Sequence, residues 1–285
     1  MDRIPVRQIS TTQKKSGTPA LFNVWELDNL LAGTDMIQEL HRHDFFYVLA
    51  LKNGSGQHYI DFTDYEICDK SVFFMRPGQV HKLVLKAGST GYLMQFSGEF
   101  YFANGKAADL MLQSAGSIYH YQPGDKGFQK LYNSLGCILQ EYTDKQPRYQ
   151  EAIRANMDIF FIQLVRQQPA DAASGASLYT QQQLEKLLAL LDTHVFTHKQ
   201  VAYYADLLNL SAYQLNTITT ITLGKTCSQV INEHIVLEAK RYLLATANQV
   251  NQIAGLLGYD DVSYFIRFFK KHTGQSPEAF RCNFS

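Results

Sequence analysis

Apolar residues in the first part of the chain come in short runs separated by turn-forming residues. The runs are rich in aromatic and β-branched side chains, and pairs such as Asn53-Gly54 and Pro77-Gly78 interrupt them. This pattern predicts five strands, at residues 45–51, 57–62, 72–75, 80–85 and 92–96. Regularly spaced short strands with tight turns are typical of a small β-sandwich or barrel.

The pattern changes to a helical period near residue 125. Residues 128–142 and 149–168 are predicted helices, and in the second Ile153, Met157 and Phe160 recur at a spacing of three to four. Such a stripe packs either against the barrel or against a second subunit, and the pattern favours neither.

The last third of the chain is predicted to be helical throughout. The expected helices are residues 181–195, 201–208, 211–223, 228–245, 249–257, 262–272 and 277–281. Residues 167–177 before them hold Pro, Gly, Ser and Ala but no large apolar side chain, which is the composition of a linker. We therefore expect four parts: a barrel at 1–125, a helical segment at 126–168, a linker at 169–178 and a helical domain at 179–285.

Composition excludes several classes of protein. The 26 Lys and Arg balance the 26 Asp and Glu, so the chain is not a globally basic protein that coats nucleic acid. No apolar run reaches the ~20 residues of a membrane helix, and the first 20 residues lack the apolar core of a secretory signal. The four cysteines lie far apart, as reduced thiols do, and they exclude a CxxC site. These features predict a cytoplasmic protein that does not contact a membrane.

An internal repeat lies within the helical domain. Residues 205–215 align with residues 254–265, and the second copy is one residue longer at its turn. Each copy has a small Ala, an apolar pair, a tight turn and an N-cap residue, Ser211 or Asp261, before a second helix. This arrangement is typical of a helix-turn-helix, whose second helix enters the DNA major groove. The alternative is a plain helical bundle.

The second copy and the residues after it also carry a family signature. The segment from residue 253 to residue 281 closely resembles the signature of AraC-family transcription regulators; the matching residues are Ile253, Ala254, Gly258, Tyr259, Asp261, Ser263, Tyr264, Phe265, Arg267, Phe269, Lys270, Lys271, Gly274, Ser276, Pro277, Phe280 and Arg281. Residues 238–244 resemble that family's linker helix, and residues 210–225 its first recognition unit. The resemblance implies a seven-helix, double helix-turn-helix domain that binds about two turns of DNA.

The resemblance also implies roles for individual residues. The expected contacts to DNA come from Ser211, Tyr213, Asn216 and Thr217 in the first unit and from Val262, Ser263, Arg267, Lys270, Lys271 and Arg281 in the second. Arg267 is expected to read guanine, or alternatively to clamp a phosphate. Lys270, Lys271 and Arg281 are expected to contact phosphates, although Lys271 also fits a solvated surface position.

The first unit departs from the family pattern. Residues 216–222 carry no charge, and Thr217 stands where many members have Arg. We therefore expect weak intrinsic DNA affinity, increased by dimerisation or by an effector.

The predicted barrel carries paired histidine motifs. His41 and His43 with the later His81 resemble the two motifs of the cupin barrel, but Tyr47 or Val48 takes the place of the Glu found in metal-binding cupins. Three histidines suffice for zinc, yet regulators of this architecture use the barrel for a small organic effector, so we expect no metal and no other cofactor. Strand alternation places His43 and Tyr47 on one face, without deciding which face lines the cavity.

An aromatic pocket with a few polar groups is typical of a small-molecule site. The candidate effector-binding residues are Trp25, His43, Tyr47, Arg76 and His81. The alternatives are that the histidines join strand ends and that Arg76 is a surface residue.

Together these observations predict an α+β protein of two domains. The N-terminal domain is a cupin-like barrel with a helical dimerisation segment, and the C-terminal domain is an all-α double helix-turn-helix. The expected function is effector-dependent transcription regulation, more often activation by family resemblance, with operator DNA, a sugar or similar small molecule, a second copy and RNA polymerase as partners. The alternatives are a metal-dependent cupin enzyme and a regulator without ligand; no catalytic motif is present in the sequence, so we expect no enzyme activity.

Overall fold

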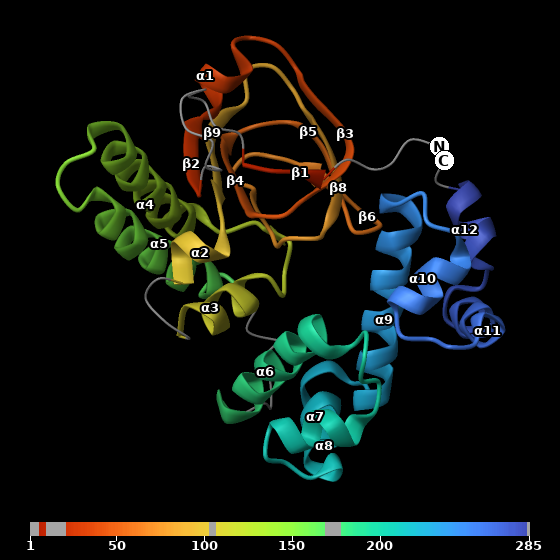
Figure 1. Ribbon diagram of the computed structural model, residues 1–285. Helices are drawn as coiled ribbons and strands as arrows, with labels where there is room; N and C mark the ends of the chain where they lie inside the picture. Colours follow the sequence, from red (N-terminus) through yellow and green to blue (C-terminus); the bar gives the residue numbers. More distant parts are fainter. Residues whose placement is uncertain (1–5, 10–20, 103–106, 169–177, 284–285) are drawn as a thin grey trace. The chain divides into compact units, whose positions relative to one another are not determined.

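The computed structural model describes residues 6–9, 21–102, 107–168 and 178–283 (Figure 1). They form two compact units, an N-terminal unit that ends at residue 168 and a C-terminal unit whose described part begins at residue 178. The linker expected at 169–178 lies outside the described residues, except for residue 178. No helix in the described part of the chain is long and apolar enough to span a bilayer.

The N-terminal unit is built on two five-stranded sheets (Figure 1). The strand pairs are antiparallel, except that β1 and β3 run parallel. The first sheet has the order β1 (Val6–Arg7), β3 (Met36–His43), β8 (Val80–Leu85), β5 (Gly56–Ile60), β6 (Thr63–Ile67). The second sheet has the order β10 (His120–Tyr121), β7 (Val72–Met75), β4 (Phe46–Asn53), β9 (Thr90–Phe96), β2 (Phe22–Glu26).

The side chains of β4 divide between two hydrophobic cores. Tyr47 and Leu49 point into the core between the two sheets, whereas Phe46 and Val48 belong to a second core on the outer face of the second sheet. Successive side chains of a strand point to opposite faces, so this division follows from the pleat. It also decides the question that alternation left open: the face that carries Tyr47 lines the barrel interior.

Helices cover the outer face of the second sheet. α4 (Asp125–Asp144) and α5 (Tyr149–Val165) pack there, with the Phe161 ring 5.1 Å from Phe74 and 5.8 Å from Phe96 between centroids. The shorter helices α1 (Leu27–Leu31), α2 (Gly98–Tyr101) and α3 (Ala107–Ala115) complete the unit. The helical pair thus covers the barrel, one of its two expected roles, while α5 leaves Ile159 50% exposed.

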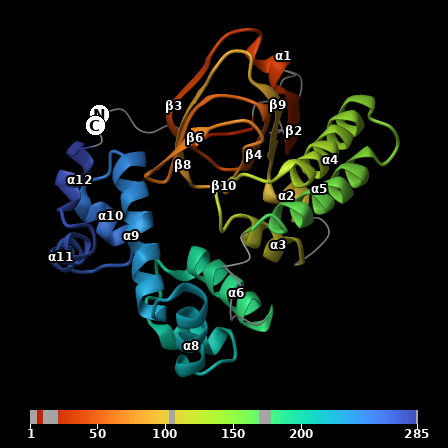
Figure 2. The same cartoon turned by 180° about the vertical axis from the view of Figure 1, so that it is seen from behind.

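The described part of the C-terminal unit holds seven helices (Figures 1 and 2). They are α6 (Leu178–His194), α7 (Val201–Leu207), α8 (Ala212–Leu223), α9 (Cys227–Ala245), α10 (Val250–Leu256), α11 (Val262–Thr273) and α12 (Pro277–Asn283). α6, α7 and α8 pack on the first half of α9, where Leu191, Leu215 and Ile231 share one core. The second half of α9 contacts α12, since Lys240 lies over the Phe280 ring.

Candidate functional site

The same turn joins the helices of both halves of the repeat. In the first, Asn209 has a positive φ of 54° and the Leu210 amide donates to the Ala205 carbonyl at 2.9 Å. In the second, Gly258 has φ of 69° and the Tyr259 amide donates to the Ala254 carbonyl, also at 2.9 Å. The two segments that align in sequence therefore form the same backbone hydrogen bond. Each also has a residue in the left-handed conformation at the equivalent position.

Each second helix begins at the N-cap residue expected from the sequence. The Ser211 hydroxyl accepts from the Gln214 amide, and the Gln214 side chain accepts in return from the Ser211 amide, which completes a capping box. The Asp261 carboxylate accepts from the amides of Ser263 and Tyr264 at 2.7 and 3.1 Å. These bonds satisfy amides that have no partner within the helix, so they set where α8 and α11 begin.

The side chains of α8 differ in how freely they can meet a ligand. Tyr213 is 81% exposed, so its ring is accessible to a ligand. The Thr217 hydroxyl, in contrast, already donates a hydrogen bond to the Tyr213 carbonyl at 2.9 Å. Asn216 is half-buried, and its Oδ1 accepts from the Cys227 amide at 3.1 Å. The expected base-reading residue Asn216 therefore also anchors α8 to the start of α9.

α11 carries the positive charge that α8 lacks. Arg267 has 69% of its side chain exposed, and its guanidinium lies 4.0 Å from the exposed Asp261 carboxylate. Ser263, Lys270 and Lys271 are exposed, and Val262 is half-buried. Exposed ion pairs contribute little to stability, so Arg267 remains available for a partner with better geometry.

Arg281 makes bonds within the protein that the sequence did not predict. Its Nε donates to the Leu243 carbonyl at 3.0 Å and its terminal nitrogen to the Asn248 carbonyl at 2.6 Å. The guanidinium thus ties α12 to the end of α9 and to the connection that follows it. These bonds hold the side chain against the protein and favour a structural role for Arg281, while the expected phosphate contact remains a prediction.

Sequence reasoning missed Lys199. Its ammonium donates to the Gly258 carbonyl at 2.9 Å and lies 4.7 Å from the centre of the Tyr259 ring. Together with Arg267 and Lys271 it lines a cavity of about 420 Å³ beside α11. Nothing in the spacing of the sequence connects Lys199 to a turn 59 residues later; only the fold does.

In the N-terminal unit, a β-bulge aims two histidines into the barrel. The register between β3 and β8 shifts between Gln38 and His41, after which His41 lies opposite His81. A bulge inserts one extra residue and so changes which positions face inward. His41 and His43 consequently point into the interior, and β5 adds His58; all four rings are buried.

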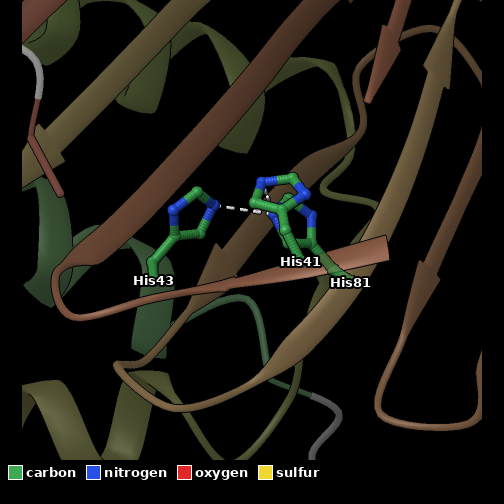
Figure 3. Close-up of side chains that lie close together, drawn as sticks. All are labelled: His41, His43 and His81. Atoms are coloured by element: carbon green, nitrogen blue, oxygen red, sulfur yellow. Dashed lines mark hydrogen bonds between the residues drawn. The ribbon is translucent and has the colours of Figure 1, made fainter. Parts of the chain in front are cut away.

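The four imidazoles make a chain of close contacts; Figure 3 draws the rings of His41, His43 and His81, and His58 lies beside them. His81 Nε2 lies 2.7 Å from His43 Nε2 and 3.0 Å from His41 Nε2. His81 Nδ1 lies 2.9 Å from His58 Nε2. His58, like Lys199, is a residue that sequence reasoning missed, because no histidine motif includes it.

Burial keeps these rings neutral at physiological pH. It lowers the pKa of His41 to about 4 and that of His43 and His58 to about 3, and it lowers the pKa of His81 well below its usual value. The physical cause is the loss of water around a charged ring, and neighbouring histidines add to it for His43. Neutral imidazoles have one nitrogen lone pair each, which is the form that accepts hydrogen bonds or binds metals.

Of the expected effector-binding residues, the structure brings three together. The Tyr47 ring centroid lies 5.4 Å from His43 and 5.5 Å from His81, and the buried Tyr47 hydroxyl has no partner among the described residues. Trp25 packs at the edge of the same core from β2. Arg76 follows β7 and packs its aliphatic stem against Gly116, after the end of α3.

Comparison with known proteins agrees with both parts of this description. A helix-turn-helix domain model matches residues 204–283, and an AraC-like ligand-binding domain model matches residues 33–158. The chain thus combines the two domain types of AraC-type transcription regulators. The resemblance and the two-domain α+β fold inferred from the sequence are thereby confirmed.

Relatives with the same two domains are similar to this chain over most of their length. The transcriptional activator RhaS of Pectobacterium carotovorum is 28% identical over 246 residues, which is 85% of this chain and 86% of the relative. RhaS of Yersinia pseudotuberculosis is 24% identical over 249 residues, 85% of this chain and 88% of the relative. The structure of ToxT from Vibrio cholerae, solved with an unsaturated fatty acid, is 15% identical with a TM-score of 0.40 and covers 92% of this chain and 94% of its own.

Proposed function

We propose that this AraC-family protein activates transcription by binding a specific double-stranded DNA operator through α8 and α11. The observation that carries the proposal is the pair of helix-turn-helix units whose turns share the same backbone hydrogen bond, both packed on one helix, α9. A single unit would be weak support, because helical hairpins are common; two in one compact unit are characteristic of DNA readers.

The length of α9 supports binding to successive major grooves. It has 19 residues, which at 1.5 Å per residue corresponds to about 28 Å. One turn of B-DNA is about 34 Å, so a helix of this length can carry two recognition helices at a spacing on the scale of one turn.

The residues of the two helices have two proposed roles, contacts to base edges and contacts to phosphates. In this proposal, Arg267 reads guanine through a bidentate pair, with Ser211, Tyr213, Thr217, Val262 and Ser263 beside it at the base edges, while Lys270 and Lys271 contact phosphates. Asn216 reaches DNA only if its bond to the Cys227 amide opens.

The N-terminal unit is proposed to regulate DNA binding. A small polar molecule such as a sugar would bind beside His43, Tyr47 and His81, where polar groups lie within an aromatic interior. Its binding shifts the population of the DNA-competent state. The exposed Ile159 and Ile162 of α5 are proposed to contact a second copy, and RNA polymerase is the expected partner of an activator in the cytoplasm.

The test is capture of fragmented genomic DNA by the full-length protein at ~50 and ~200 mM salt, because contacts to phosphate alone weaken steeply over that range. We expect a few sharp peaks that share one motif. Arg267→Ala should weaken binding to that motif by about 5- to 150-fold, the equivalent of ~1–3 kcal/mol.

Arg148→Ala is the matched control, because it removes the same charge from an exposed position in the N-terminal unit. The proposal requires that Arg148→Ala bind the motif as the parent protein does. Diffuse binding, or equal losses in the two variants, would contradict sequence-specific reading by α11.

A further inference from the structure

We propose that His41, His43 and His81 bind one divalent transition-metal ion of the zinc type inside the barrel, through their Nε2 atoms. The ligand atoms of the three side chains all lie within 4.8 Å of one another, and all three residues are buried. In Figure 3 the His43 ring faces the rings of His41 and His81 across a small gap. The proposal is independent of DNA binding and goes beyond it.

Hydrogen bonding alone does not explain this arrangement. The Glu39 carbonyl lies 2.7 Å from His41 Nδ1, and because a carbonyl only accepts, Nδ1 carries the proton of the neutral ring. His41 Nε2 therefore presents a lone pair towards His81 Nε2, 3.0 Å away, while His43 Nε2 lies 2.7 Å from the same atom.

At most one of these two contacts can be a well-aligned hydrogen bond. If His81 Nε2 donates to His41, its single proton is not available to His43. If a proton lies between His43 and His81, the His41 lone pair has no donor. A cation that accepts a lone pair from each of the three nitrogens satisfies them all.

The surrounding bonds orient the rings as they do around bound metals. Metal-binding histidines commonly donate their second ring N–H to a carbonyl or a similar acceptor, which fixes the tautomer. His41 does so to Glu39, and with an ion on its Nε2 the His81 ring would donate its Nδ1 proton to His58 Nε2, which lies 2.9 Å away. We therefore assign His58 as a positioning residue that holds His81 Nε2 towards the ion.

The donor set selects the kind of ion. Three neutral imidazoles suit zinc, nickel or copper rather than magnesium or calcium, which prefer oxygen. Zinc–nitrogen bonds of about 2.0–2.1 Å separate tetrahedral ligand atoms by about 3.3 Å. The two contacts of His81 must therefore lengthen by a few tenths of an ångström, while the Nε2 atoms of His41 and His43, which lie within 4.8 Å of each other, adjust around the ion. The fourth position remains for a water or an oxygen-bearing ligand, beside the unpartnered Tyr47 hydroxyl.

The experiment uses the full-length protein after chelator treatment, titrated with Zn²⁺ in competition with a chromophoric chelator. We expect one equivalent of Zn²⁺ and, with Co²⁺, the intense visible absorption of a tetrahedral site. The double variant His41→Gln, His81→Gln should lose the stoichiometric site. His58→Gln should keep one equivalent but bind it about 10- to 100-fold more weakly.

His120→Gln is the matched control, since His120 lies in the second sheet and its Nε2 contacts the Ser71 hydroxyl. It should bind zinc as the parent protein does, and circular dichroism checks that each variant is folded. The proposal is overturned if the parent binds no stoichiometric zinc, if the site survives in the double variant, or if His120→Gln loses it equally. If the double variant does not fold, the Co²⁺ spectrum of the parent protein decides instead: an octahedral spectrum overturns the proposal.

Discussion

Two arginines of the C-terminal unit show how surroundings decide a residue's role. Arg267 and Arg281 both belong to the family signature, and both were expected to contact DNA. Arg267 is exposed beside a weak ion pair, whereas Arg281 donates to the carbonyls of Leu243 and Asn248. Identical side chains thus bond to the protein at one position and lie exposed at the other.

This difference predicts opposite effects of substitution. Arg281→Ala should lower the free energy of unfolding of the C-terminal unit by about 2 kcal/mol, because two partly buried carbonyls lose a charged donor. Urea unfolding followed by the helical circular dichroism signal measures it. Lys270→Ala should stay within about 0.5 kcal/mol of the parent but reduce the salt dependence of operator binding by about one ion.

The comparison of the two variants decides between structural and DNA-contact roles. If Arg281→Ala unfolds like the parent and loses a phosphate contact instead, our assignment of this residue is wrong.

At the scale of elements, the turn between α10 and α11 shows why glycine stands at residue 258. Its φ of 69° is strained for any other residue, and a Cβ there would lie 1.9 Å from the Phe196 carbonyl oxygen. The backbone of the α6–α7 connection therefore packs directly on the turn that aims α11. Asn209 fills the equivalent position in the first unit, where a left-handed Asn is tolerated.

Gly258→Ala should consequently destabilise the C-terminal unit by about 2–4 kcal/mol, since both the positive φ and the contact with Phe196 must change. Gly255→Ala is the control three residues earlier, where a Cβ meets nothing within 4 Å. That substitution should leave stability unchanged or raise it by up to about 1 kcal/mol, because Ala favours a helix. Thermal unfolding of both variants, followed by the helical circular dichroism signal, measures the two changes. Equal losses of stability in Gly258→Ala and Gly255→Ala would contradict this account.

Strand β3 is an element that the hydrophobic pattern missed. Before the bulge its even-numbered residues are the less exposed ones, and after it the odd-numbered His41 and His43 are buried. Because the alternation between exposed and less exposed residues changes phase at the bulge, a search for alternating hydrophobicity predicts a strand in neither half. The bulge that hides β3 from sequence analysis is also the feature that assembles the histidine cluster.

At the scale of the whole molecule, positive charge is distributed unevenly between the two recognition helices. α8 has no charged residue, whereas α11 carries Arg267, Lys270 and Lys271 without an acidic side chain. Because phosphate contacts supply much of DNA affinity, one copy of the C-terminal unit should bind weakly by itself.

A fragment of residues 178–285 should therefore bind the operator about 100-fold or more weakly than the full-length protein. Two linked copies gain such a factor from effective concentration alone. Fluorescence anisotropy with labelled operator DNA at fixed salt compares the two proteins, and analytical ultracentrifugation reports whether each is dimeric. A monomeric fragment that binds as tightly as the full-length protein would refute dimer-dependent affinity.

The sequence by itself determined the fold class, the family and the places of most elements. The repeat at residues 205–215 and 254–265 predicted both turns and both N-caps, because those features depend on local backbone conformation and on neighbouring residues. Alternation placed His43 and Tyr47 on one face for the same local reason.

Only the tertiary structure decided which groups meet. His58 joins His81, Lys199 joins Gly258 and Arg281 joins Leu243 across 23, 59 and 38 residues of sequence, and no local pattern encodes those separations. Which face of β4 lines the barrel likewise depends on where the second sheet and the helices pack. Contacts between distant segments arise from the packing of whole elements. They determine the chemistry of the site, and neither the periodicity nor the spacing of residues in the sequence predicts them.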